Sequence, residues 1–159
     1  MMLIIVFIIF TGKINHMFSK TCEYAIKTMV FIKTMEPKGI HIGLKLIAQT
    51  IDSPQAFTAK ILQRLVRADL LQSIRGPHGG FKINDKNGPI YLKDIVVAID
   101  GDALFSKCVL GFDKCSSEEP CAVHYKFSEV RKELNRTLSD TKLDEIAGIV
   151  EAGMGTLKL

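Results

Sequence analysis

The sequence predicts a mainly α-helical protein that contains one small β-hairpin. Apolar residues recur at helical spacing through most of the 159-residue chain. Two short β-prone runs, over residues 70–74 and 81–83, flank a connection rich in glycine and proline, which is the pattern of a hairpin. A hydrophobic content of 47% and a charged content of 24% are ordinary for a globular protein.

Three helices are expected before the hairpin. The first spans residues 19–35, where apolar residues form a stripe at helical spacing. A short helix follows over residues 44–51. The third spans residues 54–68, with Ser53 as its expected N-cap and Pro54 at its first position. Three helices followed by a hairpin is the order of a winged helix-turn-helix.

Two further helices are expected over residues 91–100 and 122–138, and a weaker one over residues 139–152. The helix over residues 122–138 carries an apolar stripe made of Val123, Phe127, Val130 and Leu134. Such a stripe is either the seam of a homodimer or a face that packs on its own domain, and spacing alone does not choose between them.

The chain is predicted to consist of five parts. Residues 1–16 are expected to be a non-native extension. Their apolar run covers about half of the roughly twenty residues that a membrane helix needs, and basic residues do not precede it as they would in a secretory signal. The other parts are the winged helix-turn-helix domain, a linking helix with a cysteine-rich loop, a dimerisation helix with the C-terminal segment, and a tail; they span residues 17–84, 85–121, 122–152 and 153–159.

Charge is distributed unevenly along the chain. Residues 17–84 hold ten basic and four acidic side chains, whereas residues 85–159 hold ten basic and thirteen acidic ones. This asymmetry indicates that the first half meets a polyanion, and the expected partner is double-stranded DNA. Four cysteines are too few for a disulfide scaffold and no export signal is visible, so we expect a cytoplasmic protein without a membrane segment.

The third helix offers side chains suited to DNA. Gln55 and Thr58 lie near its N-terminus, where recognition helices read base edges in the major groove. Lys45, Lys60 and Arg64 suit phosphates, which position a protein without specifying sequence. An amphipathic helix with a solvated basic face is the alternative interpretation.

The hairpin strengthens the DNA-binding interpretation. Arg75 precedes a turn that contains three glycines and one proline. A thin tip carrying one arginine suits the narrow, electronegative minor groove of A/T-rich DNA. His78 and Lys82 are expected to add phosphate contacts.

Three of the four cysteines gather with one histidine in a stretch of seventeen residues, as Cys108, Cys115, Cys121 and His124. Thiolates are soft ligands, and a short loop can bring three of them to one metal centre. The spacing C-x6-C-x5-C-x2-H lacks the C-x2-C pairs of structural zinc sites, so an iron–sulfur site is favoured. A zinc site and a thiol–disulfide switch are the alternatives. Cys22 stands apart and is expected to be a small buried hydrophobic residue.

The order of these motifs resembles the IscR/NsrR family of dimeric winged-helix bacterial transcription regulators, several of which bind an iron–sulfur cluster. The resemblance covers about residues 17–138. It rests on Glu23-Tyr24-Ala25, on residues 57–65 of the third helix, on the wing over residues 75–81, and on the Cys108…Cys115…Cys121-x2-His124 pattern.

The resemblance implies that Cys108, Cys115 and Cys121 are thiolate ligands and that the helix after Cys121 is the dimerisation helix. It offers two candidates for the fourth ligand: His124, which is favoured, and Glu23 of the partner subunit. The implied cofactor is an iron–sulfur cluster, 2Fe–2S in preference to 4Fe–4S.

The sequence departs from the iron–sulfur assembly regulators at two places. Six residues rather than five separate Cys108 from Cys115, and Ala59 stands where those regulators carry a glutamate. The signal sensed, whether cluster supply, nitric oxide or redox stress, therefore stays open.

The expected function is that of a homodimeric DNA-binding regulator, a repressor, whose operator affinity is controlled by an iron–sulfur cluster. The sequence contains no nucleotide-binding loop, no paired catalytic carboxylates and no nucleophile with a convincing base, so no enzyme is expected.

Overall fold

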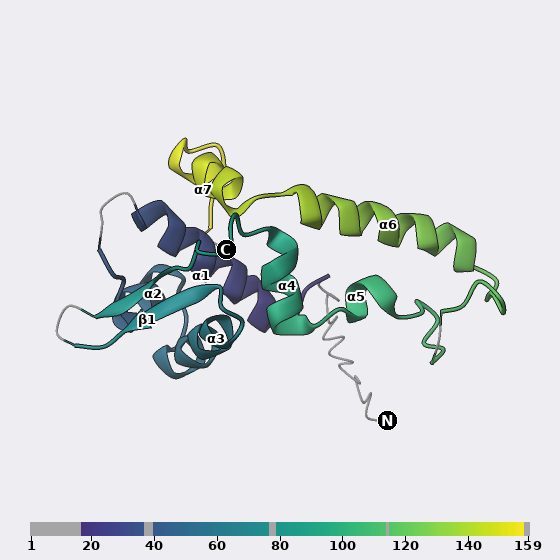
Figure 1. The fold of residues 1–159 in the computed structure, drawn as a ribbon, viewed down its shortest axis with the longest axis horizontal. Coiled ribbons are helices and arrows are strands. Elements are labelled where there is room, and N and C mark those ends of the chain that lie inside the picture. Colours follow the sequence, from purple (N-terminus) through teal and green to yellow (C-terminus); the bar gives the residue numbers. More distant parts are fainter. Residues whose placement is uncertain (1–16, 37–39, 77–78, 114, 158–159) are drawn as a thin grey trace, which may run out of the picture.

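The computed structural model describes residues 17–36, 40–76, 79–113 and 115–157. The expected extension over residues 1–16 and the wing residue His78 lie outside these ranges. Within them the chain forms seven helices and a two-stranded antiparallel sheet (Figure 1). The elements are α1 (Lys20–Met35), α2 (Leu44–Thr50), α3 (Gln55–Arg67), β1 (Leu71–Ile74), β2 (Gly80–Ile83), α4 (Leu92–Asp100), α5 (Ala103–Ser106), α6 (His124–Asp140) and α7 (Leu143–Glu151).

The predicted fold class is confirmed, with two local differences. The single turn α5 was not expected, because four residues are too few to show a helical period. The predicted N-cap of α3 is wrong: Pro54 takes that place, and the Ser53 hydroxyl is buried without a hydrogen-bond partner among the described residues.

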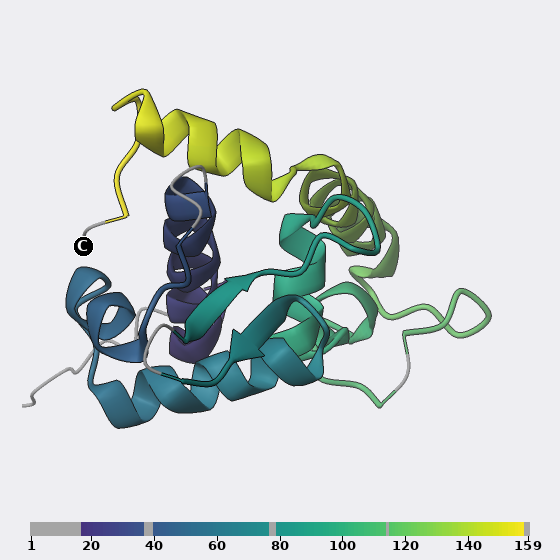
Figure 2. The ribbon, with the colours of Figure 1, turned by 60° about the vertical axis from the view of Figure 1, so that its left-hand side comes forward.

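Helix α1 lies at the centre of the fold, in contact with α2, α3, α4, α7 and β2 (Figure 2). Because neighbours surround it, apolar residues on several of its faces are buried, among them Met29, Val30 and Ile32. Each such side chain contributes on the order of 1.5–3 kcal/mol by leaving water. Cys22 is fully buried in the same core, as predicted.

The N-terminus of α1 is tied to the C-terminus of α4. The Ser19 hydroxyl caps α1 by accepting a hydrogen bond from the Cys22 backbone N–H at 3.1 Å. The Ser19 backbone N–H and hydroxyl donate to the two carboxylate oxygens of Asp100, at 2.8 and 2.5 Å. Asp100 is the last residue of α4, so this contact fixes where the chain enters the segment that leads to the cysteines.

The base of the wing is held by a buried asparagine. Asn84 donates to the backbone carbonyl of Asp69 at 2.9 Å and to its carboxylate at 2.6 Å, and accepts from Gln72 at 2.7 Å. Asp69 follows Ala68, the C-cap of α3, and has a positive φ of 60°, a conformation that asparagine and aspartate tolerate better than most residues. These bonds orient the hairpin relative to α3.

Phe81 in β2 pairs with Ile42 ahead of α2, through two backbone hydrogen bonds of 3.0 Å. A Cβ at the neighbouring Gly80 would lie 2.7 Å from the Ile42 carbonyl oxygen, and the φ of Gly80 is +155°. Glycine is therefore required for this close backbone approach.

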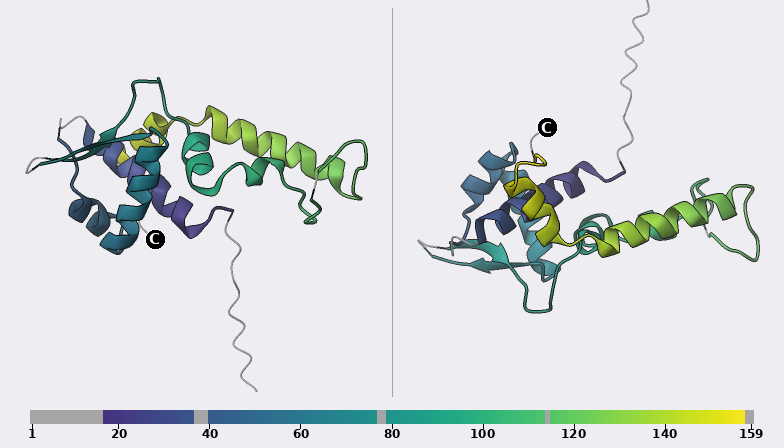
Figure 3. Two further views of the ribbon diagram at one scale, coloured as in Figure 1. Left: turned by 60° about the horizontal axis from the view of Figure 1, so that its bottom comes forward. Right: turned by 90° about the horizontal axis from the view of Figure 1, so that it is seen from above.

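Helix α6 extends away from the rest of the fold (Figures 1 and 3). Its C-terminal end is anchored because Leu138 is buried and Thr141 accepts a hydrogen bond from the backbone N–H of Leu92 at 2.9 Å. Helix α7 then returns to α1, where Leu143 is buried in the core. The N-terminal end of α6 and the cysteine loop consequently lie at the opposite end of the molecule from the hairpin.

In the part of the chain that the structure describes, no helix combines the length and the apolar character needed to cross a bilayer.

Candidate functional site

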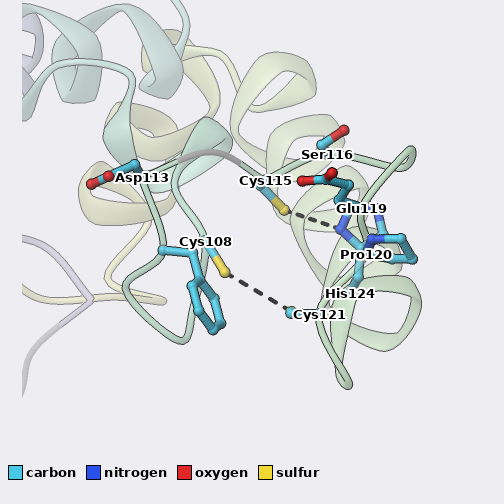
Figure 4. A pocket seen from close by; sticks show the side chains of 9 residues that line it. Cys108, Asp113, Cys115, Ser116, Glu119, Pro120, Cys121 and His124 are labelled. Carbon is cyan, nitrogen blue, oxygen red and sulfur yellow. Dashed lines mark hydrogen bonds between the residues drawn. The ribbon is translucent and has the colours of Figure 1, made fainter.

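The loop between α5 and α6 surrounds a cavity of about 560 Å³ (Figure 4). Cys108 follows α5 by two residues, Cys115 lies in the middle of the loop, and His124 is the first residue of α6. The wall of the cavity includes all four predicted ligands: Cys108, Cys115, Cys121 and His124. The folded chain therefore brings the sequence motif to one site.

The four donor side chains face the cavity as two pairs. The Cys108 and Cys121 sulfurs are 4.0 Å apart, and the Cys115 sulfur lies 3.3 Å from Nδ1 of His124 (Figure 4). Cys108 and His124 are buried, whereas Cys115 and Cys121 are half-buried. Among the described residues, no group of three or more cysteine, histidine or acidic side chains is arranged to hold a single metal ion.

Backbone groups of the loop favour the thiolate form of Cys108. A hydrogen bond with the Leu110 backbone lowers the pKa of the Cys108 thiol, and the Phe112 backbone and the Cys121 side chain act in the same direction against the effect of burial. The thiolate is both the metal-binding form and the nucleophilic form of cysteine.

Arg131 was not identified from the sequence as part of this site. Its Nη2 donates a hydrogen bond to the Cys115 sulfur at 3.0 Å. The signal that would have found it is helical spacing. Arg131 lies seven residues, or two turns, after His124, so both side chains share one face of α6.

The alternative fourth ligand, Glu23, lies in the first turn of α1 and forms an ion pair with Lys20 at 2.9 Å. It is not part of the cavity wall in its own chain. Its expected role was as a ligand from the partner subunit, and that role stays a prediction.

Most of the predicted DNA contacts are exposed to solvent. The exposed side chains are Lys45 on α2, Gln55 and Lys60 on α3, Arg75 at the wing and Lys82 on β2. They are available for contacts with an external partner.

Two of the predicted DNA contacts on α3 have hydrogen-bond partners within the chain. Thr58 is fully buried, and its hydroxyl donates to the Pro54 carbonyl oxygen at 3.1 Å. Arg64 is exposed, but its guanidinium donates to the backbone carbonyls of Ala98, at 3.4 Å, and Ile99 at the C-terminal end of α4. Thr58 faces the core and is not accessible to a nucleic acid, whereas Arg64 joins two helices and its DNA contact stays a prediction.

The predicted apolar stripe of α6 divides into two parts. Leu134 packs against the core of its own chain, and Val123 is half-buried. Phe127 and Val130 keep 38% and 59% of their surface exposed. The two interpretations of the stripe therefore apply to different residues: packing within the chain for Leu134, and an uncovered apolar surface for Phe127 and Val130.

Comparison with known proteins places the chain in a family. The Rrf2 family model, described as an iron-dependent transcriptional regulator, matches residues 18–148. A protein of Aquifex aeolicus (strain VF5), provisionally named an HTH-type transcriptional regulator, is 28% identical over 137 residues, which cover 84% of this chain and 93% of that protein.

Two solved structures share the fold. CymR of B. subtilis, described as the global cysteine regulator of that organism, has a TM-score of 0.69 at 23% identity, covering 82% of this chain and 95% of its own. IscR of T. potens has a TM-score of 0.64 at 21% identity, covering 91% and 96%. Because the family model matches most of the chain and the winged-helix architecture agrees with it, the chain belongs to the Rrf2 family of DNA-binding transcriptional regulators, which are not enzymes.

Proposed function

We propose that this regulator is a homodimer whose affinity for DNA is controlled by an iron–sulfur cluster bound by Cys108, Cys115, Cys121 and His124. The observation that carries the proposal is the meeting of three thiols and one imidazole on the wall of one cavity. Soft sulfur donors with a nitrogen donor match the ligand chemistry of such clusters. When bound, the cluster would supply a redox-active centre.

The grouping of the donors favours a cluster over zinc. A single tetrahedral ion, with metal–sulfur bonds of about 2.3 Å, needs all its ligands around one point. The donors lie instead as a Cys108–Cys121 pair and a Cys115–His124 pair. Two pairs suit a 2Fe–2S cluster, in which each iron takes two protein ligands. A 4Fe–4S cluster is the second form to consider.

A thiol–disulfide switch is a second candidate function. Its support is the 4.0 Å separation of the Cys108 and Cys121 sulfurs, which a modest loop movement would bring to the bonding distance of about 2.05 Å. Oxidation would then produce a specific Cys108–Cys121 disulfide, detectable by mass spectrometry in protein that contains no iron.

For DNA binding, we propose that α3 enters the major groove and the wing follows the minor groove. Gln55 would read a base edge, Lys45, Lys60 and Lys82 would contact phosphates, and Arg75 would enter the minor groove. Support comes from the exposure of these side chains on neighbouring elements. Arg75→Ala should weaken operator binding, measured by fluorescence anisotropy at several salt concentrations; unchanged affinity would remove Arg75 from the interface.

The cluster proposal is tested by metal and sulfide analysis of protein purified without oxygen. We expect coloured protein with iron and acid-labile sulfide in comparable amounts. Replacing Cys115 with serine should abolish the colour, whereas replacing Cys22 with serine should leave the iron content unchanged, because Cys22 lies in the core of the DNA-binding domain. Colourless wild-type protein with stoichiometric zinc would overturn the proposal.

A further inference from the structure

The hydrogen bond between Arg131 and Cys115 is directed at a proposed cluster ligand. Nη2 of Arg131 lies 3.0 Å from the Cys115 sulfur, within a part-buried contact. Arg131 is not part of the cavity wall that the four donors form, so its guanidinium reaches the sulfur without occupying the space between the pairs. The side chain therefore touches a ligand and leaves the ligand set unchanged.

The charge of Arg131 is not balanced by a nearby carboxylate. In the described ranges, no ion pair joins Arg131 to an acidic side chain. Its neighbours on α6 differ: Lys132 pairs with Glu129 at 2.8 Å, and Arg136 pairs with Glu133 at 2.7 Å. The positive charge of Arg131 is thus directed at the Cys115 sulfur.

Two acidic residues belong to the cavity wall. Asp113 and Glu119 line it beside the three cysteines (Figure 4). A bound cluster would add the charges of three thiolates, and each further electron would increase the repulsion. A cation in contact with one ligand sulfur offsets that repulsion, and more strongly in the reduced state than in the oxidised state.

We infer that Arg131 is a positioning residue that raises the reduction potential of the centre bound at this site. The inference rests on the proposed cluster. Hydrogen bonds to ligand sulfurs and local net charge are both general determinants of iron–sulfur potentials. Through its N–H···S bond and its charge, Arg131 stabilises the reduced cluster, so it sets the redox poise at which the regulator changes state.

The test is an anaerobic redox titration of cluster-loaded protein, followed by visible absorbance. Arg131→Gln should retain iron and sulfide but shift the midpoint to a more negative potential. A tenfold weaker affinity for the electron corresponds to about 59 mV for a one-electron couple. Arg136→Gln is the matched control. It makes the same substitution on the same helix at an exposed residue, and its midpoint should equal that of the wild type.

The possible outcomes separate the inference from the proposal beneath it. Wild-type protein without iron and sulfide overturns the cluster proposal, and the inference with it. If the wild-type protein binds the cluster but Arg131→Gln and Arg136→Gln have equal midpoint potentials, only the inference about Arg131 is overturned. If Arg131→Gln does not bind the cluster, Arg131→Lys is the deciding variant. A cluster bound by Arg131→Lys at the wild-type midpoint supports a role for the positive charge. Loss of the cluster in Arg131→Lys as well overturns the inference.

Discussion

At the residue scale, α3 shows how one helix divides its polar side chains between two tasks. Lys60 is exposed, whereas Arg64, four residues later, donates to carbonyls at the end of α4. The last carbonyls of a helix lack partners within the helix, and a guanidinium satisfies them well. Arg64 therefore stabilises the contact between α3 and α4, and Lys60 stays exposed for the proposed phosphate contact.

Lys60 and Arg64 should consequently respond differently to substitution. Lys60→Ala should leave stability unchanged and reduce the slope of log affinity for DNA against log salt by about 1. Arg64→Met should lower the free energy of unfolding by about 1 kcal/mol, because it removes hydrogen bonds between α3 and α4. Urea denaturation and salt-dependent anisotropy measure the two effects. An unaltered stability of Arg64→Met, with a reduced salt slope, would instead assign Arg64 to the DNA interface.

Cys22 should be chemically silent in the folded protein. Burial raises the pKa of Cys22 to about 12, and the charge of Asp100 adds to that shift. Because the thiolate is the reactive form, iodoacetamide at pH 8 should modify Cys115 and Cys121 in the metal-free native protein and leave Cys22 unmodified until urea is added. Peptide mass spectrometry identifies the labelled residues; labelling of Cys22 at the rate of Cys121 would contradict its placement.

The same shift has a consequence for stability. The folded-state pKa of Cys22 lies above its ordinary value of 9.0, so the protonated thiol favours the folded state. This contribution is fully present below about pH 9 and is lost as the pH rises toward 12.

At the element scale, α6 is anchored at one end and uncovered at the other. Leu138 and Leu134 attach its C-terminal half to the core. Farther toward its N-terminus, Val130 and Tyr125 expose 59% and 65% of their surface. An apolar helix surface that extends from a domain in this way is typical of an interaction surface, and a second copy of α6 would cover it.

Charge on this surface should dissociate the proposed dimer. The double substitution of Phe127 and Val130 by glutamate should give a monomer, because it places carboxylates in the apolar seam. Lys132→Glu, on the opposite side of α6, is the control and should remain dimeric. Light scattering coupled to size exclusion measures the mass. If the wild-type protein is itself a monomer at micromolar concentration, α6 is not a dimerisation helix.

At the scale of the whole molecule, the cysteine loop and the hairpin lie at opposite ends (Figures 1 and 3). The loop therefore does not control α3 of its own chain by direct contact. Two described elements connect the cysteine loop to the rest of the fold. One is the end of α4, where Arg64 and Ser19 attach α3 and α1 just before the chain turns toward the cysteines. The other is α6, which leads to the proposed partner.

The response to the cluster should therefore depend on the dimer. In the wild type, loading the cluster should change operator affinity by a factor within the range of about 5–150 that is typical of coupled sites. In the Phe127/Val130 glutamate variant, the loop should still bind iron, but DNA affinity should no longer depend on loading. Anisotropy on loaded and metal-free protein makes the comparison, and a monomer that retains the full response would assign the coupling to α4.

Much of the fold could be predicted because its signals are local. Helical spacing marks α1, α3, α4 and α6, and glycine with proline marks the wing, since backbone preferences act over a few residues. The cysteine motif is local as well: its four donors fall within one loop and the first residue of one helix, so spacing alone identified them as a group.

What spacing could not predict depends on neighbours that are distant in the chain. The inward position of Thr58, the bond from Arg64 to α4, the division of the α6 stripe and the contact of Arg131 with Cys115 all follow from how helices pack. A periodic pattern shows which side chains share a helix face, but whether that face is buried or exposed depends on the elements that pack against it. In this protein the pattern specifies the helices and groups the four proposed ligands, and packing determines which side chains remain free to meet DNA, a metal centre or a second copy.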